Sequence, residues 1–170
     1  MTTTESSIEV VGADGDIKAT NRNGGIRIKD CKGNMTLETS SGEIHVSNLQ
    51  GCVLLAKTTN ALISIRGATA VESAETSKSD VVAEISTVRA NGTRITVNAG
   101  SIGLYVSSDL NADIELKTLS GDIAIHSFDR LRTSDDTGSG YLKGTIGTGG
   151  NKISAETSKG NIDLFRSGTT

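Results

Sequence analysis

Glycine recurs at intervals of nine residues near the beginning of the chain, and this spacing is the feature that most restricts the fold. The regularly spaced glycines are Gly15, Gly24, Gly33, Gly42 and Gly51. An apolar residue follows each glycine two positions later, and apolar and polar residues then alternate. Alternation with a period of two is typical of a half-buried strand, and glycine permits the backbone angles of a tight bend. The unit is therefore a short strand followed by a turn.

Two classes of strand alternate along the chain, so the nine-residue unit is half of a larger repeat. The first members of one class, at steps of 18 to 21 residues, are Ile26, Ile44, Ile63, Ala83, Leu104, Ile123, Leu142 and Ile162. Those of the other class are Ile17, Met35, Val53, Val71, Ile95, Ile114, Leu131 and Ile153. An apolar corner follows the first class, and a polar corner that usually contains threonine follows the second. This double recurrence indicates stacked coils that pair in parallel.

We therefore predict an all-β fold, a single-chain parallel β-helix (β-solenoid) of about eight coils with roughly 19–20 residues each. Each coil is expected to lie on the coil before it in the sequence. Residues 8–166 would form the solenoid, with terminal tails at 1–7 and 167–170. The absence of proline agrees with this fold, because proline cannot donate to a central strand ladder. An antiparallel β-sandwich is the alternative, because it also suits short strands with frequent turns.

The inward positions of the first strand class form the predicted core. Burial of each aliphatic side chain there stabilises the fold by about 1.5–3 kcal/mol. The predicted core residues are Ile26, Ile28, Ile44, Val46, Ile63, Ile65, Ile85, Val106, Ile123, Ile125, Ile162 and Leu164. The threonines of the polar corners are expected to hydrogen-bond along the axis. A hydroxyl ridge that binds sugar or another chain is the alternative.

The net charge of −3 and the composition exclude several classes of protein. No basic patch indicates a nucleic-acid partner, and no stretch approaches the roughly 18 apolar residues of a membrane span. Cys31 and Cys52 are too few for a disulfide framework, so we expect free thiols. The first residues lack the basic and apolar regions of a signal peptide. We expect a cytoplasmic protein or, if a signal or anchor was trimmed, one of the cell envelope or the extracellular space.

The candidate cofactor and metal motifs are weak, and we expect neither group. Calcium-binding β-rolls share the glycine period, but the residues after the glycines here do not supply oxygen ligands at every step. The glycine-rich stretch 144–152 lacks the G-K-[ST] ending of a phosphate loop. His45 and His126 occupy outward positions and are expected to be solvated.

Three runs share one further pattern: LETSSGEI at 37–44, LKTLSGDI at 116–123 and AETSKGNI at 155–162. They resemble the T-S-S-G-[DE]-I repeat of a bacterial family of domains of unknown function that is labelled as adhesins. The resemblance covers roughly residues 8–166 and implies a β-helical fold, usually in an envelope or surface setting. It implies no activity and no functional residue, because the adhesin label rests largely on fold analogy.

A charged segment after position 128 is the main candidate site. We interpret it as a surface loop for interactions that contains Asp129, Arg130, Arg132, Asp135 and Asp136. The same side chains are the best candidates for a polysaccharide lyase or glycosidase, which needs paired carboxylates and aromatic side chains that stack on sugars. The chain has only two tyrosines and two phenylalanines for such stacking.

We therefore expect a non-catalytic scaffold or adhesin-like module of the cell envelope or surface that presents a repetitive β face. Its expected partner is a surface glycan, a protein, or another copy bound through a solenoid end, because such ends leave strand edges unpaired. The alternatives are a polysaccharide-active enzyme on the same fold and a cytoplasmic β-helix that forms filaments.

Overall fold

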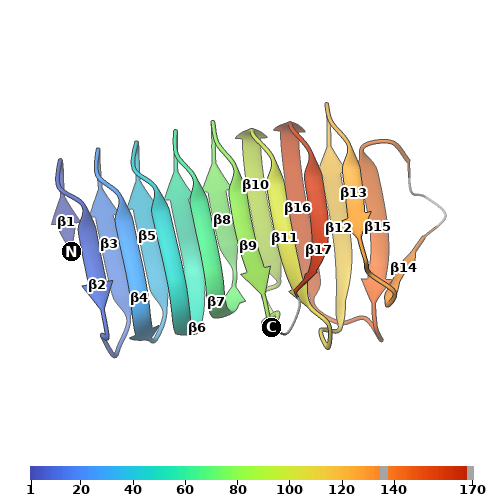
Figure 1. Cartoon of the computed structure of the whole chain (residues 1–170), viewed down its shortest axis with the longest axis horizontal. Helices are drawn as coiled ribbons and strands as arrows, with labels where there is room; N and C mark the ends of the chain where they lie inside the picture. Colours follow the sequence, from blue (N-terminus) through green and yellow to red (C-terminus); the bar gives the residue numbers. More distant parts are fainter. Residues whose placement is uncertain (135–137, 168–170) are drawn as a thin grey trace.

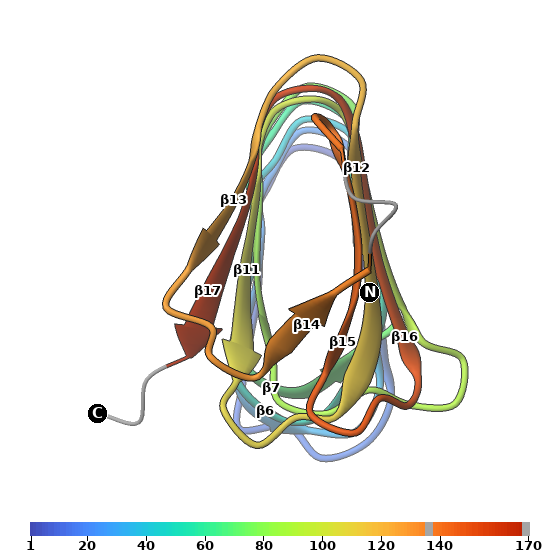
Figure 2. The ribbon, with the colours of Figure 1, turned by 90° about the vertical axis from the view of Figure 1, so that its right-hand side faces the viewer.

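The computed structural model describes residues 1–134 and 138–167, and these residues form strands and turns without a helix. All of their strands belong to one hydrogen-bonded sheet that winds around a flattened core (Figure 1). Figure 2 looks along the axis and shows two long sides that converge at the top and lie farther apart at the bottom. The described part of the chain is therefore all-β and β-solenoid-like.

Each long side of the solenoid is a row of neighbouring strands. The first side consists, in spatial order, of β2 (Ile8–Val11), β4 (Ile26–Lys32), the start of β6 (Ile44–Thr58), β7 (Ile63–Val71), β9 (Val81–Ile85), β11 (Ile102–Ser107), β17 (Ile162–Ser167) and β13 (Ile123–His126). The second side consists of β1 (Thr2–Thr3), β3 (Ile17–Asn21), β5 (Met35–Thr39), the end of β6, β8 (Ser73–Thr76), β10 (Thr93–Ala99), β16 (Lys152–Lys159), β12 (Ala112–Thr118), β15 (Tyr141–Ile146) and β14 (Leu131–Thr133).

Equivalent residues of successive coils pair in parallel register in the N-terminal part of the chain. Ile26 pairs with Ile44, and Ile44 pairs with Ile63. Because strand side chains alternate between the two faces of the sheet, these three side chains point inward together, and each is at most 1% exposed. The predicted aliphatic column is present here, and Ile85 and Leu164 are buried in the same core.

The turn glycines are required because neighbouring turns stack closely. A Cβ atom added at Gly42 would overlap the carbonyl of Gly24, and one added at Gly51 would overlap the carbonyl of Gly33. Of the five glycines in the nine-residue period, Gly24, Gly33, Gly42 and Gly51 therefore lie where stacked turns leave no room for a side chain, whereas a Cβ at Gly15 would meet nothing within 4 Å.

Five threonines of the polar corners have a structural role. Their side chains are buried, and each hydroxyl donates to a backbone carbonyl of an adjacent turn. The bonds run from Thr39 to Gly24 (3.1 Å), Thr58 to Gly42 (3.2 Å), Thr76 to Ala61 (3.4 Å), Thr118 to Gly160 (2.8 Å) and Thr157 to Gly100 (2.8 Å). These hydroxyls tie turns together along the axis, so they do not form a free ridge for a ligand.

The predicted stacking of each coil on the preceding one is wrong near the C-terminus. The coil made by β16 and β17 lies between the coil of β10 and β11 and the coil of β12 and β13. Figure 1 shows this directly, because the red C-terminal strands lie between yellow-green and yellow-orange ones. The prediction failed because the coils share the same pattern of inward aliphatic side chains, so the periodicity of the sequence does not specify which coils are neighbours.

The prediction that 131–133 and 142–144 form one more parallel coil is also wrong. β15 runs antiparallel to β12, and β14 runs antiparallel to β15. The two strands extend the second side and close part of the end of the rod (Figure 2). The chain therefore does not form the predicted run of about eight successive coils.

Two predicted core residues are not buried. Ile123 is partly buried and Ile125 is 38% exposed, because their strand β13 pairs only with β17 and lacks a neighbour on its other edge. The predicted N-terminal tail is also wrong, because Thr2 and Thr3 form β1 and pair with β3. At the other terminus Ser167 belongs to β17, and residues 168–170 lie outside the described part of the chain.

Candidate functional site

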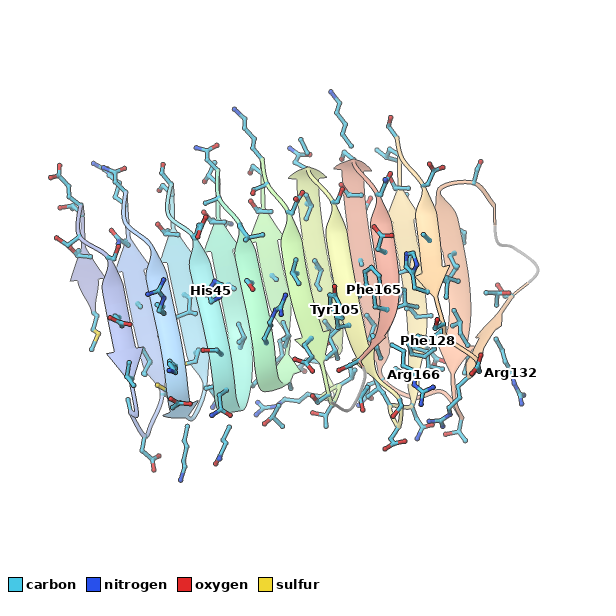
Figure 3. The ribbon with its side chains drawn as sticks, in the orientation of Figure 1. His45, Tyr105, Phe128, Arg132, Phe165 and Arg166 are labelled. Carbon is cyan, nitrogen blue, oxygen red and sulfur yellow. The ribbon has the colours of Figure 1, made fainter. Side chains whose placement is uncertain are left out.

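Three of the four aromatic side chains gather in one place: Tyr105 and Phe165 lie on the outside of the solenoid, and Phe128 packs, partly buried, against the hydrophobic core. Tyr105 lies on β11, Phe165 on β17 and Phe128 in the turn after β13, and all three are partly exposed. Figure 3 shows them on the first side, together with Arg166. We call Arg66, Tyr105, Phe128, Phe165 and Arg166 the arginine–aromatic surface.

Three rings of this region form a continuous stack across the coil of β16 and β17, which we call the inserted coil. Phe165 lies 4.8 Å from Tyr105 and 4.5 Å from His126 between ring centroids, with interplanar angles of 15° and 9°. The strand register explains the stack, because both rings are cross-strand neighbours of Phe165. The His126 Nε2 atom also lies 2.9 Å from Asp163 Oδ1. Each aromatic pair contributes about 0.5–1.5 kcal/mol beyond its area burial, so the stack holds three strands together.

A hollow of about 300 Å³ adjoins the stack at Tyr105. Its walls are Arg66, Glu84, Tyr105, Arg166 and Ser167. One Glu84 carboxylate oxygen accepts a hydrogen bond from the Ser167 hydroxyl at 2.8 Å, and the other accepts one from a backbone N–H, that of Gly67, at 3.0 Å. Within the described residues, neither guanidinium has an ion pair or a side-chain hydrogen bond. Two exposed guanidinium groups are therefore available beside one aromatic ring.

A second hollow, of about 180 Å³, continues the first beyond Arg166. Phe128, Asp129 and Arg130 line it with Ser108. Arg130 is not free for binding, because its guanidinium donates to the Ser108 carbonyl at 2.6 Å and to Asn111 Oδ1 at 3.1 Å. This arginine of the predicted interaction loop therefore fixes the turn between β11 and β12.

The other arginine of the predicted loop lies elsewhere. Arg132 lines a shallow groove of about 1000 Å³ with Asp113, Glu115, Lys143 and Lys152 on the outside of β12, β14, β15 and β16. Two of the charges in this groove are paired with each other. Lys152 forms an ion pair with Glu115, and the Tyr141 hydroxyl donates to Glu115 at 3.1 Å. These two hydrogen bonds lower the pKa of Glu115.

The structure thus does not bring Arg132 together with Asp129 and Arg130, the other described residues of the predicted loop. Asp129 and Arg130 line one hollow, Arg132 lines another, and Asp135 and Asp136 lie outside the described residues. The two histidines also lie apart, His45 on β6 and His126 on β13.

The remaining reactive side chains do not converge on a site. Cys31 and Cys52 are buried free thiols, and burial raises the pKa of Cys52. Across residues 1–134 and 138–167, no cluster of three or more histidine, cysteine, aspartate or glutamate side chains is arranged to hold a metal ion.

The arginine–aromatic surface was missed by the sequence reasoning. Tyr105 and Phe165 each follow a buried leucine, Leu104 or Leu164, so both could be assigned to outward positions. Their contact depends on β17 pairing with β11, which stacking in sequence order does not predict. The signal available was the shared pattern of an aromatic residue directly after the second inward aliphatic one.

Comparison with curated proteins and with solved structures gave no significant match. The described residues contain no helix of the length and apolarity that a membrane crossing requires. A family model described as Toastrack DUF4097 matches residues 6–164. This match agrees with the predicted membership of a family of domains of unknown function, and it carries neither the adhesin label nor the T-S-S-G-[DE]-I repeat. The chain belongs to the Toastrack DUF4097 family.

Proposed function

We propose that the chain is a non-catalytic, adhesin-like module of the bacterial cell envelope or surface, and that its arginine–aromatic surface binds an acidic glycan. The envelope setting follows from the resemblance of its repeats to the adhesin-labelled family. In this proposal the stacked coils, a parallel β-helix over most of the chain, act as a rigid scaffold that presents the binding surface.

The observation that carries the proposal is the pair of exposed guanidinium groups beside the Tyr105 ring. A guanidinium group donates two parallel hydrogen bonds to a carboxylate, and such pairs are stronger than neutral hydrogen bonds. An aromatic ring offers an apolar surface for the C–H face of a sugar. A hollow of about 300 Å³ is at the lower end of the range for ligand pockets, which suits one sugar unit. A uronic acid residue combines these features.

Glu84 places a negative charge in the same hollow, and this charge provides a second test of the proposal. Its carboxylate would repel a bound uronate, although its hydrogen bonds to Gly67 and Ser167 hold it in place. The change Glu84→Gln preserves an acceptor oxygen and removes the charge. We expect this variant to bind the acidic sugar more tightly.

Isothermal titration calorimetry with oligomers of galacturonic acid, and with neutral galactose oligomers as the matched ligand, tests the proposal. We expect binding of the acidic oligomer only, loss of binding in Arg66→Ala/Arg166→Ala, and no change in Arg94→Ala, which removes an exposed arginine on the second side. Equal binding of both oligomers, or full binding by the double variant, would contradict it. Binding of polyglutamate in place of the sugar would indicate an acidic peptide as the partner instead.

The same oligomers test the enzyme alternative. Release of new reducing ends that is lost in Asp135→Ala or Asp136→Ala would show a polysaccharide-active enzyme. Unbranched filaments of the isolated chain in electron microscopy and sedimentation would favour the filament alternative.

A further inference from the structure

The C-terminal coil, residues 152–167, occupies a slot between two coils that precede it in the sequence. Its first wall is β10 and β11, and its second wall is β12 and β13. Every strand of the coil is therefore paired on both edges, although it belongs to the end of the chain. An element placed in this way must enter after both walls have formed, or the second wall must close over it.

The contacts between the coil and its slot are regular and in register. Leu164 pairs with Leu104 on one wall and with Ile125 on the other, and Phe165 is sandwiched between Tyr105 and His126. Turn hydrogen bonds also cross the slot boundary, because Thr157 donates to the Gly100 carbonyl at 2.8 Å. All of these contacts involve residues far apart in the sequence, so any copy of the coil could make them.

The connection to the coil, which we call the hinge, is rich in glycine. Residues 147–151 lead from β15 to β16, and Gly147, Gly149 and Gly150 adopt positive φ angles of 61°, 79° and 154°. Such angles are strained for other residues, so this segment is held in a conformation that glycine tolerates. Asn111 accepts hydrogen bonds from the backbone N–H of Thr148 at 3.0 Å and from Arg130 at 3.1 Å, which fastens the hinge to the turn it crosses.

We propose that two copies of the chain exchange their C-terminal coils, so that residues 152–167 of each copy fill the slot of the other. The exchanged dimer would keep every coil-to-slot contact, and only the hinge would change its path. Domain swapping of this kind is an accessible route to a dimer because no new interface is needed. The partner is thus a second copy, and the interaction surface is the slot itself.

Disulfide trapping between two full-length variants tests the exchange. Thr96 on β10 and Glu156 on β16 are paired neighbours on the outer face, and both are exposed. One chain would carry Thr96→Cys and the other Glu156→Cys. The mixed chains would be incubated at high concentration in denaturant below the unfolding midpoint, returned to buffer and oxidised mildly. We expect a covalent dimer whose linking peptide, identified by mass spectrometry, joins positions 96 and 156.

The matched control uses Lys57→Cys in one chain and Glu75→Cys in the other. These residues are paired neighbours on β6 and β8 in the same outer face, where the coils stack in sequence order. We expect several-fold less covalent dimer from this pair. Thr96→Cys/Glu156→Cys in a single chain should form an internal bond, remain monomeric and no longer exchange. Equal yields from the test and control mixtures would overturn the proposal.

Discussion

The two halves of this solenoid follow the same local rules and differ in which coils are neighbours. From β1 to β11, each coil pairs with the next coil in the sequence. From β12 to β17, the last coil lies inside the stack and an antiparallel pair, β14 and β15, extends one side. Local periodicity determines the strand and the turn, whereas the order of the coils depends on contacts between distant residues.

This difference has consequences for folding. In the first half, paired residues such as Ile26 and Ile44 are separated by one coil, so each coil can add to the one already formed. In the second half, the bond from the Ser167 hydroxyl to Glu84 joins residues 83 positions apart. Contacts between distant residues slow folding because their loop-closure entropy must be overcome first. We therefore expect the second half to form last.

The largest expected effect comes from truncating a core side chain of the inserted coil. Leu164→Ala removes a fully buried side chain that pairs with Leu104 and Ile125. We expect a loss of about 2–5 kcal/mol in the free energy of unfolding, measured by denaturant titration. Ile28→Ala is the control in the first half. Both variants should lose stability, but only Leu164→Ala should speed amide hydrogen exchange in β13. Unchanged exchange in β13 of Leu164→Ala would show that β17 does not stabilise β13.

A smaller effect is expected from crowding a stacked turn of the first half. Gly42→Ala would force a Cβ against the Gly24 carbonyl and separate two turns, at a cost of about 1–3 kcal/mol in unfolding free energy. Gly138 precedes β15 in the second half, and a Cβ there would meet nothing within 4 Å. Gly138→Ala should therefore change stability by less than about 1 kcal/mol. Equal losses in thermal unfolding would mean that the turns of the first half are not tightly stacked.

Arg130 fixes the turn between β11 and β12 in the second half. Arg130→Ala removes the hydrogen bonds to Ser108 and Asn111, and we expect a loss of about 1–2 kcal/mol. Arg132→Ala is the matched control, because Arg132 makes no such bonds within the described residues, and it should change stability by less than about 0.5 kcal/mol. Chemical denaturation measures the free energy of unfolding of both variants. If Arg132→Ala is as destabilised as Arg130→Ala, the hydrogen bonds of Arg130 do not stabilise the turn.

The smallest expected effect is a dependence on pH. Hydrogen bonds from Lys152 and Tyr141 lower the pKa of Glu115 in the folded chain. A lowered carboxyl pKa stabilises the fold above the unfolded pKa of about 4.3, and this stabilisation is lost as the pH falls through the folded pKa. The Glu115 side chain is 31% exposed and that of Lys152 is 58% exposed, so solvent screens the pair and we expect less than about 1 kcal/mol. In Glu115→Gln, the free energy of unfolding should fall less steeply as the pH is lowered through the acid range. An unchanged pH dependence would contradict the lowered pKa of Glu115.

Much of the fold could be predicted from the sequence because it depends on neighbouring residues. Alternation placed Ile26, Ile44 and Ile63 inward, and all three are buried. The position of the C-terminal coil could not be predicted, since Ile162 and Leu164 look like the inward pair of any other coil. The exposure of Ile125 follows from that position, because the insertion leaves β13 at the edge of the first side.

The candidate site could be predicted less well for the same reason. The sequence shows the charged loop as a run of charges. In the structure, however, Arg130 donates hydrogen bonds to the Ser108 carbonyl and the Asn111 side chain, and Arg132 lies in another groove. Tyr105 and Phe165 are 60 positions apart in the sequence and become neighbours only through the inserted coil. Binding residues that come from separate coils give no local signal in the sequence.

The position of the C-terminal coil can be measured most directly by methyl NOE spectroscopy of the full chain. With the coil inserted, Leu164 should give strong cross-peaks to both Leu104 and Ile125. Leu104 and Ile125 would then be separated by two strand spacings, about 9–10 Å, and should give no strong cross-peak to each other. A strong Leu104–Ile125 cross-peak, with none from Leu164 to either residue, would show that the coils stack in sequence order and contradict the inserted coil.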